Sequence, residues 1–369
     1  MFWYIVICIL MLYPFSIVRA GAISGKKTQA VALAAACFIL WFFMAMRSTA
    51  VGVDTKYYTH IFTQFSRIPF GKVFTAETYA TDSETWSLDF EYGYRLYNKL
   101  LSFLSDGPQM ITICNSLLII GLLYVLICKE SKNYMLSIWL YLTLGIYQTE
   151  MNVARNAIAI LIVYLAFRFL EQKRPVPYVL LCLLAASFHK AAYLFLPLYW
   201  LVHHISWKPN RIVGSILLAA VIGLGFPLVM PVLKAVLPAG LTRYFTSSHS
   251  KMESVIVGVF YLMLFLLVYI LMNKRERRMM FERCHLGVTM FVLNLCCFAL
   301  SFGIGYAARI AALFGPYIIL FLPQMLDVME SRSKKKMIGL LLVLICGCQY
   351  ILRLCVNNIG GTMPYTFFW

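Results

Sequence analysis

Charged residues are scarce in this chain, and their scarcity excludes a soluble globular protein. Only 13% of the 369 residues are Asp, Glu, Lys or Arg, whereas a soluble domain carries about 25%. Hydrophobic residues make up 62% of the sequence, and the mean hydropathy is +0.79. The sequence also lacks a polar low-complexity segment and a clear internal repeat. The composition is therefore that of a membrane protein.

Motifs for metals and cofactors are also missing. The eleven cysteines do not follow the spacing of a metal site, and most of them lie inside apolar runs. A cysteine in such a run behaves as a small hydrophobic residue, so we expect no disulfide framework. The sequence contains neither an Asp-x-Asp metal motif nor a pattern typical of a nucleotide-sugar site, and no metal or cofactor is expected.

Apolar runs of about 18 residues recur along the chain, and each is long enough to cross about 30 Å of hydrocarbon. Because the runs are continuously apolar rather than alternating, they predict helices and not barrel strands. The fold is therefore expected to be all-α: a polytopic integral membrane protein with about 12 transmembrane helices, for which a GT-C-like arrangement is one candidate. The predicted helices cover residues 1–18, 28–46, 110–128, 134–149, 152–170, 175–188, 191–204, 212–233, 254–272, 286–304, 308–325 and 337–355. Glycines and prolines between 223 and 231 predict a kink or break.

Basic residues lie in short clusters between the apolar runs. With twelve crossings every cluster falls on one side, which then holds most of the 32 Lys and Arg. The positive-inside rule makes that side cytoplasmic. One transmembrane domain (1–369) with two extracytoplasmic loops, a long one at 47–109 and a second at 234–253, is the expected organisation. The clusters account for the net charge of +17, so no nucleic-acid partner is expected.

The long loop 47–109 contains two amphipathic segments. Aromatic and apolar residues at 57, 58, 61, 62 and 65 share one face of a predicted helix. Asp54 precedes that helix in an N-cap position, and it is equally a candidate acid/base or an orienter of a cationic side chain. The second segment, 86–104, is also predicted to be a helix at the outer membrane interface.

Several charged or polar residues lie at the outer ends of apolar runs, where the positive-inside rule does not require them. Each could be a snorkelling or interfacial residue. Ionisable groups at membrane depth are costly, however, and tend to line a cavity or pathway. Because Arg presents a planar fork of donors, the set predicts a cationic cup for a phosphate or pyrophosphate. Its members are Arg47, Asp54, Glu91, Arg155, Asn156, His189, Lys190, Arg243 and Arg309.

Many of these residues belong to five short blocks. The blocks are Arg47-x4-Gly52-x-Asp54-Thr55-x-x-Tyr58-x3-Phe62, Glu91-x-Gly93-Tyr94, Arg155-Asn-Ala-Ile-Ala, Phe188-His189-Lys190-x-Ala192, and Arg309 with a downstream proline. Their residue types and their order resemble the EpsG-like family of polytopic exopolysaccharide proteins. The resemblance extends over most of the chain, although Ala191 stands where the family often has Ser.

The resemblance implies a Wzy-type polymerase of lipid-linked oligosaccharide repeat units in exopolysaccharide, capsule or O-antigen biosynthesis. Such a metal-independent glycosyltransferase would transfer glycan from undecaprenyl pyrophosphate at the outer leaflet of the bacterial cytoplasmic (inner) membrane. The implied partners are the undecaprenyl-pyrophosphate-linked oligosaccharide, the lipid bilayer, and a chain-length regulator or other polysaccharide-assembly proteins.

Within that chemistry, Arg155 and Arg309 are expected to stabilise the charge of the leaving pyrophosphate. Asp54, Glu91 or His189 is expected to be the general base, and the sequence does not rank these three. The expected substrate-binding residues are Arg47, Tyr57, Tyr58, Asn156, Lys190 and Arg243.

Other functions stay open at this point. A flippase or transporter of the same lipid-linked units would use a cationic cavity too, but it should carry charges through the middle of its bundle. A polysaccharide ligase shares the polymerase chemistry and differs only in its acceptor. A membrane acyltransferase would need its histidine deeper, and a non-catalytic assembly partner would tolerate alanine in the cup.

Overall fold

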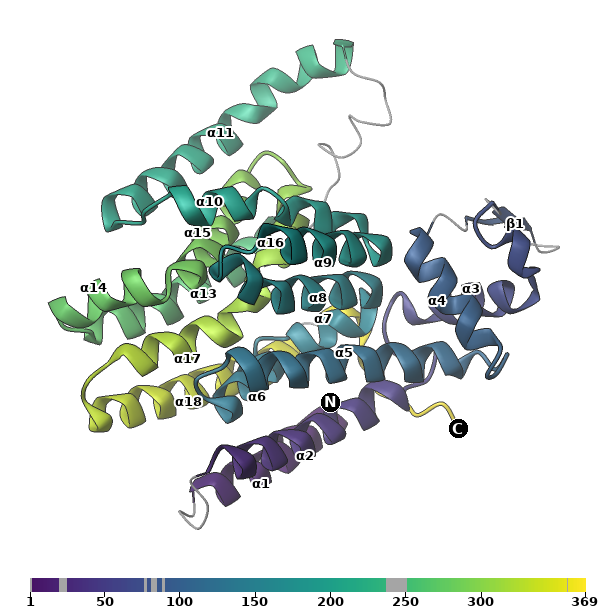
Figure 1. Cartoon of the computed structure of the whole chain (residues 1–369), viewed down its shortest axis with the longest axis horizontal. Coiled ribbons are helices and arrows are strands. Elements are labelled where there is room, and N and C mark those ends of the chain that lie inside the picture. Colours follow the sequence, from purple (N-terminus) through teal and green to yellow (C-terminus); the bar gives the residue numbers. More distant parts are fainter. Residues whose placement is uncertain are drawn as a thin grey trace. The chain divides into compact units, whose positions relative to one another are not determined.

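The structure is a computed structural model that describes residues 2–19, 25–75, 78–80, 85–87, 90–236, 251–356 and 358–369. These residues form two compact units. Figure 1 labels their helices and strands. Unit 1 comprises Met1–Tyr199 and Val343–Trp369, and unit 2 comprises Trp200–Leu342. Both units are built from helices, which confirms the predicted helical class.

Unit 1 holds the first helices and the long loop. Its helices are α1 (Phe2–Arg19), α2 (Lys26–Ala45), α3 (Thr55–Arg67), α4 (Tyr92–Ser102), α5 (Gln109–Glu130), α6 (Tyr134–Thr143), α7 (Ile146–Asn152), α8 (Ala154–Glu171) and α9 (Pro175–Phe188), with the short 3-10 helices η1 (Phe70–Lys72), η2 (Lys190–Phe195) and η4 (Ile359–Gly361). Strands β1 (Thr78–Ala80) and β2 (Thr85–Ser87) pair antiparallel, with Tyr79 opposite Trp86.

Unit 2 begins within α10 (Leu198–His204) and ends within α18 (Arg332–Val356). Between them lie α11 (Pro209–Val236), α13 (Lys251–Leu271), α14 (Lys274–Arg283), α15 (His285–Leu300), α16 (Ala307–Phe314), η3 (Gly315–Tyr317) and α17 (Ile318–Val328). Helix α11 continues through Pro227 and Pro231, so it is not broken there, and the predicted kink remains a prediction.

Five described helices are long and apolar enough to cross a membrane: Lys26–Ala45, Gln109–Glu130, Pro209–Val232, Ala307–Val328 and Arg332–Val356. A sixth span results if α14 and α15, which meet at 87°, count as one bent pair. These helices fit a multi-pass membrane protein. The twelve-crossing topology, the GT-C-like arrangement and the single transmembrane domain remain predictions.

Three predicted helices are interrupted. The run 134–149 divides into α6 and α7 at Gly145, whose φ of +77° lies in the left-handed region that glycine tolerates best. The run 191–204 forms η2 and α10, and the run 308–325 forms α16, η3 and α17. Apolar periodicity continues across each interruption, so hydropathy alone does not reveal them.

The long loop contains both predicted amphipathic helices. The first, α3, forms where the pattern predicts it, and the second, α4, covers only part of the predicted segment. Tyr58, Ile61, Phe62 and Phe65 on α3 are buried, as the spacing predicts. The predicted second helix begins only at Tyr92, because residues 85–87 form β2. On α4, the side chain of Tyr94 is fully buried. The two helices pack on each other, and this packing holds Phe90 and Glu91 at the start of α4.

Candidate functional site

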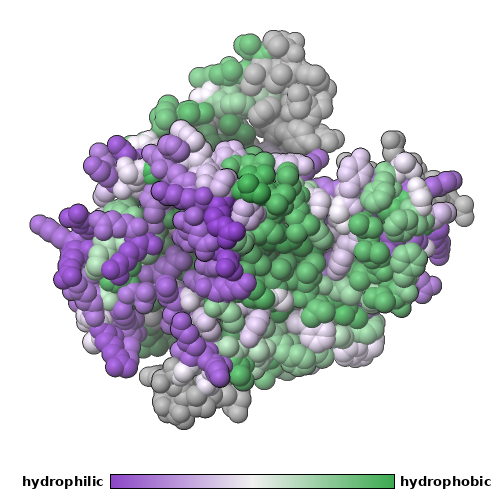
Figure 2. All heavy atoms as spheres, viewed as in Figure 1, coloured by the Kyte–Doolittle hydropathy of each residue, from purple (hydrophilic) through white to green (hydrophobic). Residues whose placement is uncertain are grey.

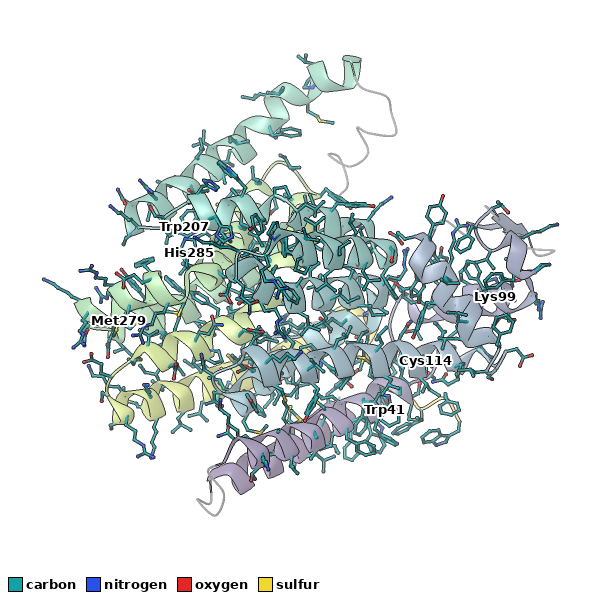
Figure 3. All side chains as sticks on the ribbon, viewed as in Figure 1. Trp41, Lys99, Cys114, Trp207, Met279 and His285 are labelled. Atoms are coloured by element: carbon teal, nitrogen blue, oxygen red, sulfur yellow. The ribbon has the colours of Figure 1, made fainter. Side chains whose placement is uncertain are left out.

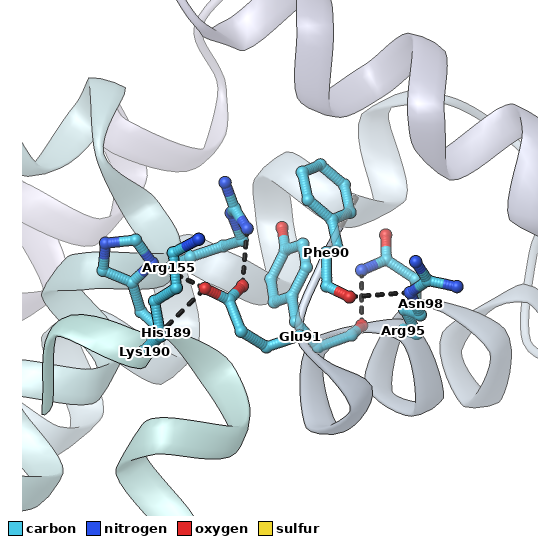
Figure 4. A network of polar contacts seen from close by, with 8 residues as sticks. Phe90, Glu91, Arg95, Asn98, Arg155, His189 and Lys190 are labelled. Carbon is cyan, nitrogen blue, oxygen red and sulfur yellow. Dashed lines mark hydrogen bonds and ion pairs between the residues drawn. The ribbon is translucent and has the colours of Figure 1, made fainter. Parts of the chain in front are cut away.

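Glu91 is the centre of a polar cluster that joins three helices of unit 1 (Figure 4). Its Oε2 lies 2.6 Å from Arg155 Nη1, and its Oε1 lies 3.0 Å from His189 Nδ1. The backbone N–H of Lys190 donates to Oε1 at 3.0 Å. The sequence predicted these four residues for one site, and the structure brings them together from blocks that are up to 99 positions apart.

Each member of the cluster lies at a helix end. Glu91 precedes α4, Arg155 is the second residue of α8, and His189 follows the last residue of α9. A helix N-terminus favours an anion and a helix C-terminus favours a cation. Glu91 and His189 therefore occupy ends that suit a carboxylate and a protonated imidazole. Arg155 lies at an unfavourable end, so it depends on Glu91 for its charge balance.

The Glu91 carboxylate is ionised at neutral pH. Burial raises its pKa, but the hydrogen bond from His189, the Arg155 guanidinium and the Lys190 N–H lower it, and the resulting pKa is about 2. An ionised carboxylate only accepts hydrogen bonds, so the proton of a neutral His189 must lie on Nδ1. The lone pair is then on Nε2, which makes His189 the member of the cluster placed to accept a proton.

Aromatic rings hold the Arg155 side chain. The guanidinium carbon lies 4.1 Å from the centre of the Phe90 ring and 5.8 Å from that of Tyr94. The phenol of Tyr58 also interacts with Arg155. The exposed fraction of the side chain is 19% for Arg155, 15% for Glu91 and 27% for His189. The cluster is thus half-enclosed, and a ligand can reach it.

In the first turn of α8, two buried polar atoms lack a partner within the described part of the chain: Nε of Arg155 and Oδ1 of Asn156. Buried polar groups in proteins nearly always form hydrogen bonds, so such a pair indicates a place for a ligand or water. These atoms belong to adjacent residues that the sequence placed in the site. They extend the cluster from Glu91 along the first turn of α8.

Gly93 lets α4 approach the end of α9. A Cβ at this position would collide with Ser187 Oγ, and it would lie 2.8 Å from the Ser187 carbonyl oxygen. Real Cβ atoms essentially never come that close, so only glycine fits without a shift of the backbone. Since Glu91 and His189 flank this contact, Gly93 sets the distance between them. The sequence block Glu91-x-Gly93-Tyr94 contained this residue, but its role could not be read without the structure.

Asp54 occupies the N-cap position of α3, as predicted, but its carboxylate makes no capping hydrogen bond. Its backbone N–H donates to Asn152 Oδ1 at 3.4 Å. The first turn of α3 carries the predicted pocket residues Tyr57 and Tyr58. The Tyr57 ring meets the Phe90 ring edge-on at 5.6 Å, which places it beside the cluster.

Arg47 is buried, and its donors are used by the protein itself. Its guanidinium donates to the carbonyl oxygens of Met44 and Met151 (2.9 Å for Met151) and to Thr55 Oγ1 at 3.3 Å. A backbone bridge to Phe367 pairs the same residue with the C-terminal segment. In this arrangement Arg47 fixes the start of α3, which in turn positions Tyr58 against Arg155.

Two predicted residues do not belong to unit 1. Arg309 is on α16 of unit 2, where its guanidinium carbon lies 5.7 Å from the centre of the Tyr306 ring. Arg243 lies outside the described residues. Among the residues that the structure describes, no group of three His, Cys, Asp or Glu side chains is placed to hold a metal ion.

The EpsG family model matches residues 31–367, which is nearly the whole chain. The chain belongs to the EpsG family. No curated protein and no solved structure matches it.

Membership in the EpsG family confirms the resemblance inferred from the sequence blocks and indicates a membrane protein of exopolysaccharide biosynthesis. The match contains the whole cluster around Glu91. Three features of this EpsG-family site were not found from the sequence: the Phe90 ring beneath Arg155, the close approach at Gly93, and the buried Tyr94 that receives a hydrogen bond from Asn115 at 3.0 Å. The block around Glu91 was the only signal for them.

Proposed function

We propose that this EpsG-family protein polymerises lipid-linked oligosaccharide repeat units at the outer leaflet, transferring the growing glycan from undecaprenyl pyrophosphate to a hydroxyl of another unit. The observation that carries the proposal is the contact of His189 Nδ1 with the ionised Glu91, which leaves Nε2 to act as a base. Family membership supplies the exopolysaccharide context.

In the proposed reaction, His189 Nε2 accepts the proton of the acceptor hydroxyl while the oxygen attacks the anomeric carbon of the donor. The bond between that carbon and the pyrophosphate oxygen breaks, and its electron pair leaves with the pyrophosphate. Glu91 stays ionised and stabilises the imidazolium, as in other carboxylate–histidine pairs. Of the three predicted bases, the geometry therefore favours His189, with Glu91 as the residue that orients it.

The leaving pyrophosphate needs a cation. Arg155 already gives Nη1 to Glu91, so its charge is largely balanced, but its Nε lacks a partner among the described residues. The Lys190 side chain is exposed and adjacent to His189 in sequence. We propose Lys190 as the main phosphate ligand, with Arg155 in support. For Arg309 the predicted role as a pyrophosphate ligand is retained as a proposal.

The location of the cluster bears on the flippase alternative. A flippase would carry polar side chains along the middle of its helices. Glu91, Arg155 and His189 instead lie at the ends of α4, α8 and α9. This placement favours chemistry at one face of the bundle over passage of a charged headgroup through it.

The proposal is tested by replacing His189 with Gln in cells that make the polymer. We expect polymer chains to be lost at a normal amount of membrane protein, since Gln cannot accept the proton. His204→Gln is the matched control, because His204 is exposed and its ring stacks on Trp200 at 4.9 Å. Wild-type polymer length in the His189 variant would exclude His189 as the base.

A further inference from the structure

Helix α14 is a highly charged helix held rigidly at its start. Asn273 and Glu276 form a capping box, in which each side chain accepts the other's backbone N–H at 2.8 Å. Glu276 is buried, and its second oxygen accepts the backbone N–H of Glu330 at 2.8 Å. Arg277 caps the preceding helix by donating to the carbonyl of Tyr269 at 3.1 Å. The start of α14 is therefore fixed both to the end of the preceding helix and to the segment before α18.

The orientation of α14 follows from its neighbour. Helix α15 is apolar, whereas α14 reads KRERRMMFER and cannot enter hydrocarbon. The two helices meet at 87°. If α15 crosses the bilayer, α14 lies close to the membrane plane at the headgroup level. On α14, Met280 is buried and Phe281 is half-buried, whereas every exposed residue is charged.

Two further segments of unit 2 join α14 at this end. Arg275 forms an ion pair with Glu330 at 3.2 Å, which brings the basic start of α18 beside α14. Trp207 donates to Thr289 at 2.8 Å and His285 contacts the Ile205 carbonyl at 2.7 Å, which brings the segment before α11 to the start of α15 (Figure 3).

Together these segments form a surface that we name the basic face. Hydrophilic side chains gather over α14 in the space-filling view (Figure 2). The three segments 205–211, 273–285 and 327–336 together contain eleven Lys and Arg but only four Asp and Glu. The cations are Lys208, Arg211, Lys274, Arg275, Arg277, Arg278, Arg283, Arg332, Lys334, Lys335 and Lys336, and the acids are Glu276, Glu282, Asp327 and Glu330.

We propose that the basic face binds the headgroups of anionic phospholipids in the bilayer that the chain spans. Three observations argue for lipid over an acidic protein. Helix α14 is nearly perpendicular to an apolar helix, and all its exposed side chains are charged. The cations come from three segments that an ion pair and hydrogen bonds join. Juxtamembrane Lys and Arg are attracted to anionic lipid, and the attraction falls with ionic strength. The fixed geometry of α14 distinguishes this face from other basic loops.

The test uses full-length protein, purified in detergent and freed of lipid, and native mass spectrometry to count bound phosphatidylglycerol against phosphatidylcholine of equal chain length. The variant K274Q/R278Q/R283Q removes three exposed cations of α14. The control K129Q/K132Q/K173Q removes three exposed cations at or just beyond helix ends of unit 1. Each cation near an anionic surface is worth roughly fivefold in affinity, so the α14 variant, which removes three cations of one face, should weaken phosphatidylglycerol binding at least tenfold. The control cations do not belong to the basic face, and their removal should weaken binding less than twofold.

A charge-preserving variant, K274R/R278K/R283K, changes the same three positions without changing their charge and should bind as the wild type does. It distinguishes the loss of charge from a folding defect caused by substitution at these positions. Wild-type binding should also weaken as salt is raised. Equal losses in the α14 variant and the control would overturn the proposal, and so would equal binding of the two lipids by the wild type. If the purified wild type shows no lipid preference but the α14 variant loses polymer in cells, an acidic protein is the partner instead.

Discussion

Replacement of Glu91 by Gln tests the centre of the cluster with little change in size. The carboxylate accepts contacts at 2.6 Å from Arg155, 3.0 Å from His189 and 3.0 Å from the Lys190 N–H. Gln keeps one oxygen, which can still serve His189 and Lys190 N–H, but its amide nitrogen then faces Arg155, a second donor. The variant therefore keeps the imidazole tautomer while it loses the ion pair and the negative charge.

The size of the effect follows from these contacts. A hydrogen bond to a charged group contributes about 1.5–3 kcal/mol. Since Glu91 and Arg155 retain 15% and 19% of their side-chain exposure, solvent weakens the pair, and we expect a loss of about 2 kcal/mol in stability. The rate should fall more, by roughly 10²-fold to 10³-fold, because acid–base catalysis contributes 10²–10⁴-fold and the imidazolium loses its counter-charge.

The assay is the length distribution of the polymer in cells that carry equal amounts of membrane protein. Glu282→Gln is the matched control, because it breaks an exposed ion pair with Arg278 at 2.9 Å and should leave the polymer unchanged. Full-length polymer from Glu91→Gln at wild-type rate would refute the role of Glu91.

Further predictions concern the supports of the site. Gly93→Ala should lower both the unfolding temperature and the activity, because its Cβ has no room beside Ser187, whereas Gly121→Ala on α5, with nothing within 4 Å, should be neutral or slightly stabilising; equal effects would contradict the steric argument. Arg47→Ala should destabilise the protein by about 3 kcal/mol, since buried carbonyl groups lose their donor, and exposed Arg67→Ala should cost little in the same thermal unfolding experiment. Because the folded pKa of Glu91 is about 2 against an ordinary value of 4.5, its stabilisation is complete above pH 4.5 and is lost as the pH falls towards 2; the difference in unfolding temperature between wild type and Glu91→Gln should follow that course, and a constant difference down to pH 2 would contradict it.

Continuous apolar runs predicted most helices within a few residues, because burial and lipid contact both require the same side chains. The run 175–188 matches α9 at both ends, and Pro175 marks its start. The division at Gly145 was missed, since an isolated glycine is tolerated inside a helix and does not by itself predict a break. Helix α14 was missed for the opposite reason: its charges gave no apolar periodicity, and its capping box depends on neighbours in space.

The candidate site was predictable in its residue types but not in its pairing. Unexpected charges at helix ends pointed to Glu91, Arg155 and His189, yet no local pattern shows that one carboxylate contacts both of the others. Arg47 illustrates the limit more clearly. Its sequence context suggested a substrate-binding cation of the cup, whereas the structure surrounds it with carbonyl groups and with the C-terminal segment at Phe367.

The most direct test of the polymerase proposal is a reconstituted reaction. Purified full-length protein in liposomes would be mixed with the lipid-linked repeat unit isolated from cells that make the polymer, and the products would be separated on a gel. The proposal predicts a ladder of lipid-linked oligomers that is absent with His189→Gln and present with His204→Gln. Transbilayer movement of the unit without a ladder would contradict it and favour a flippase.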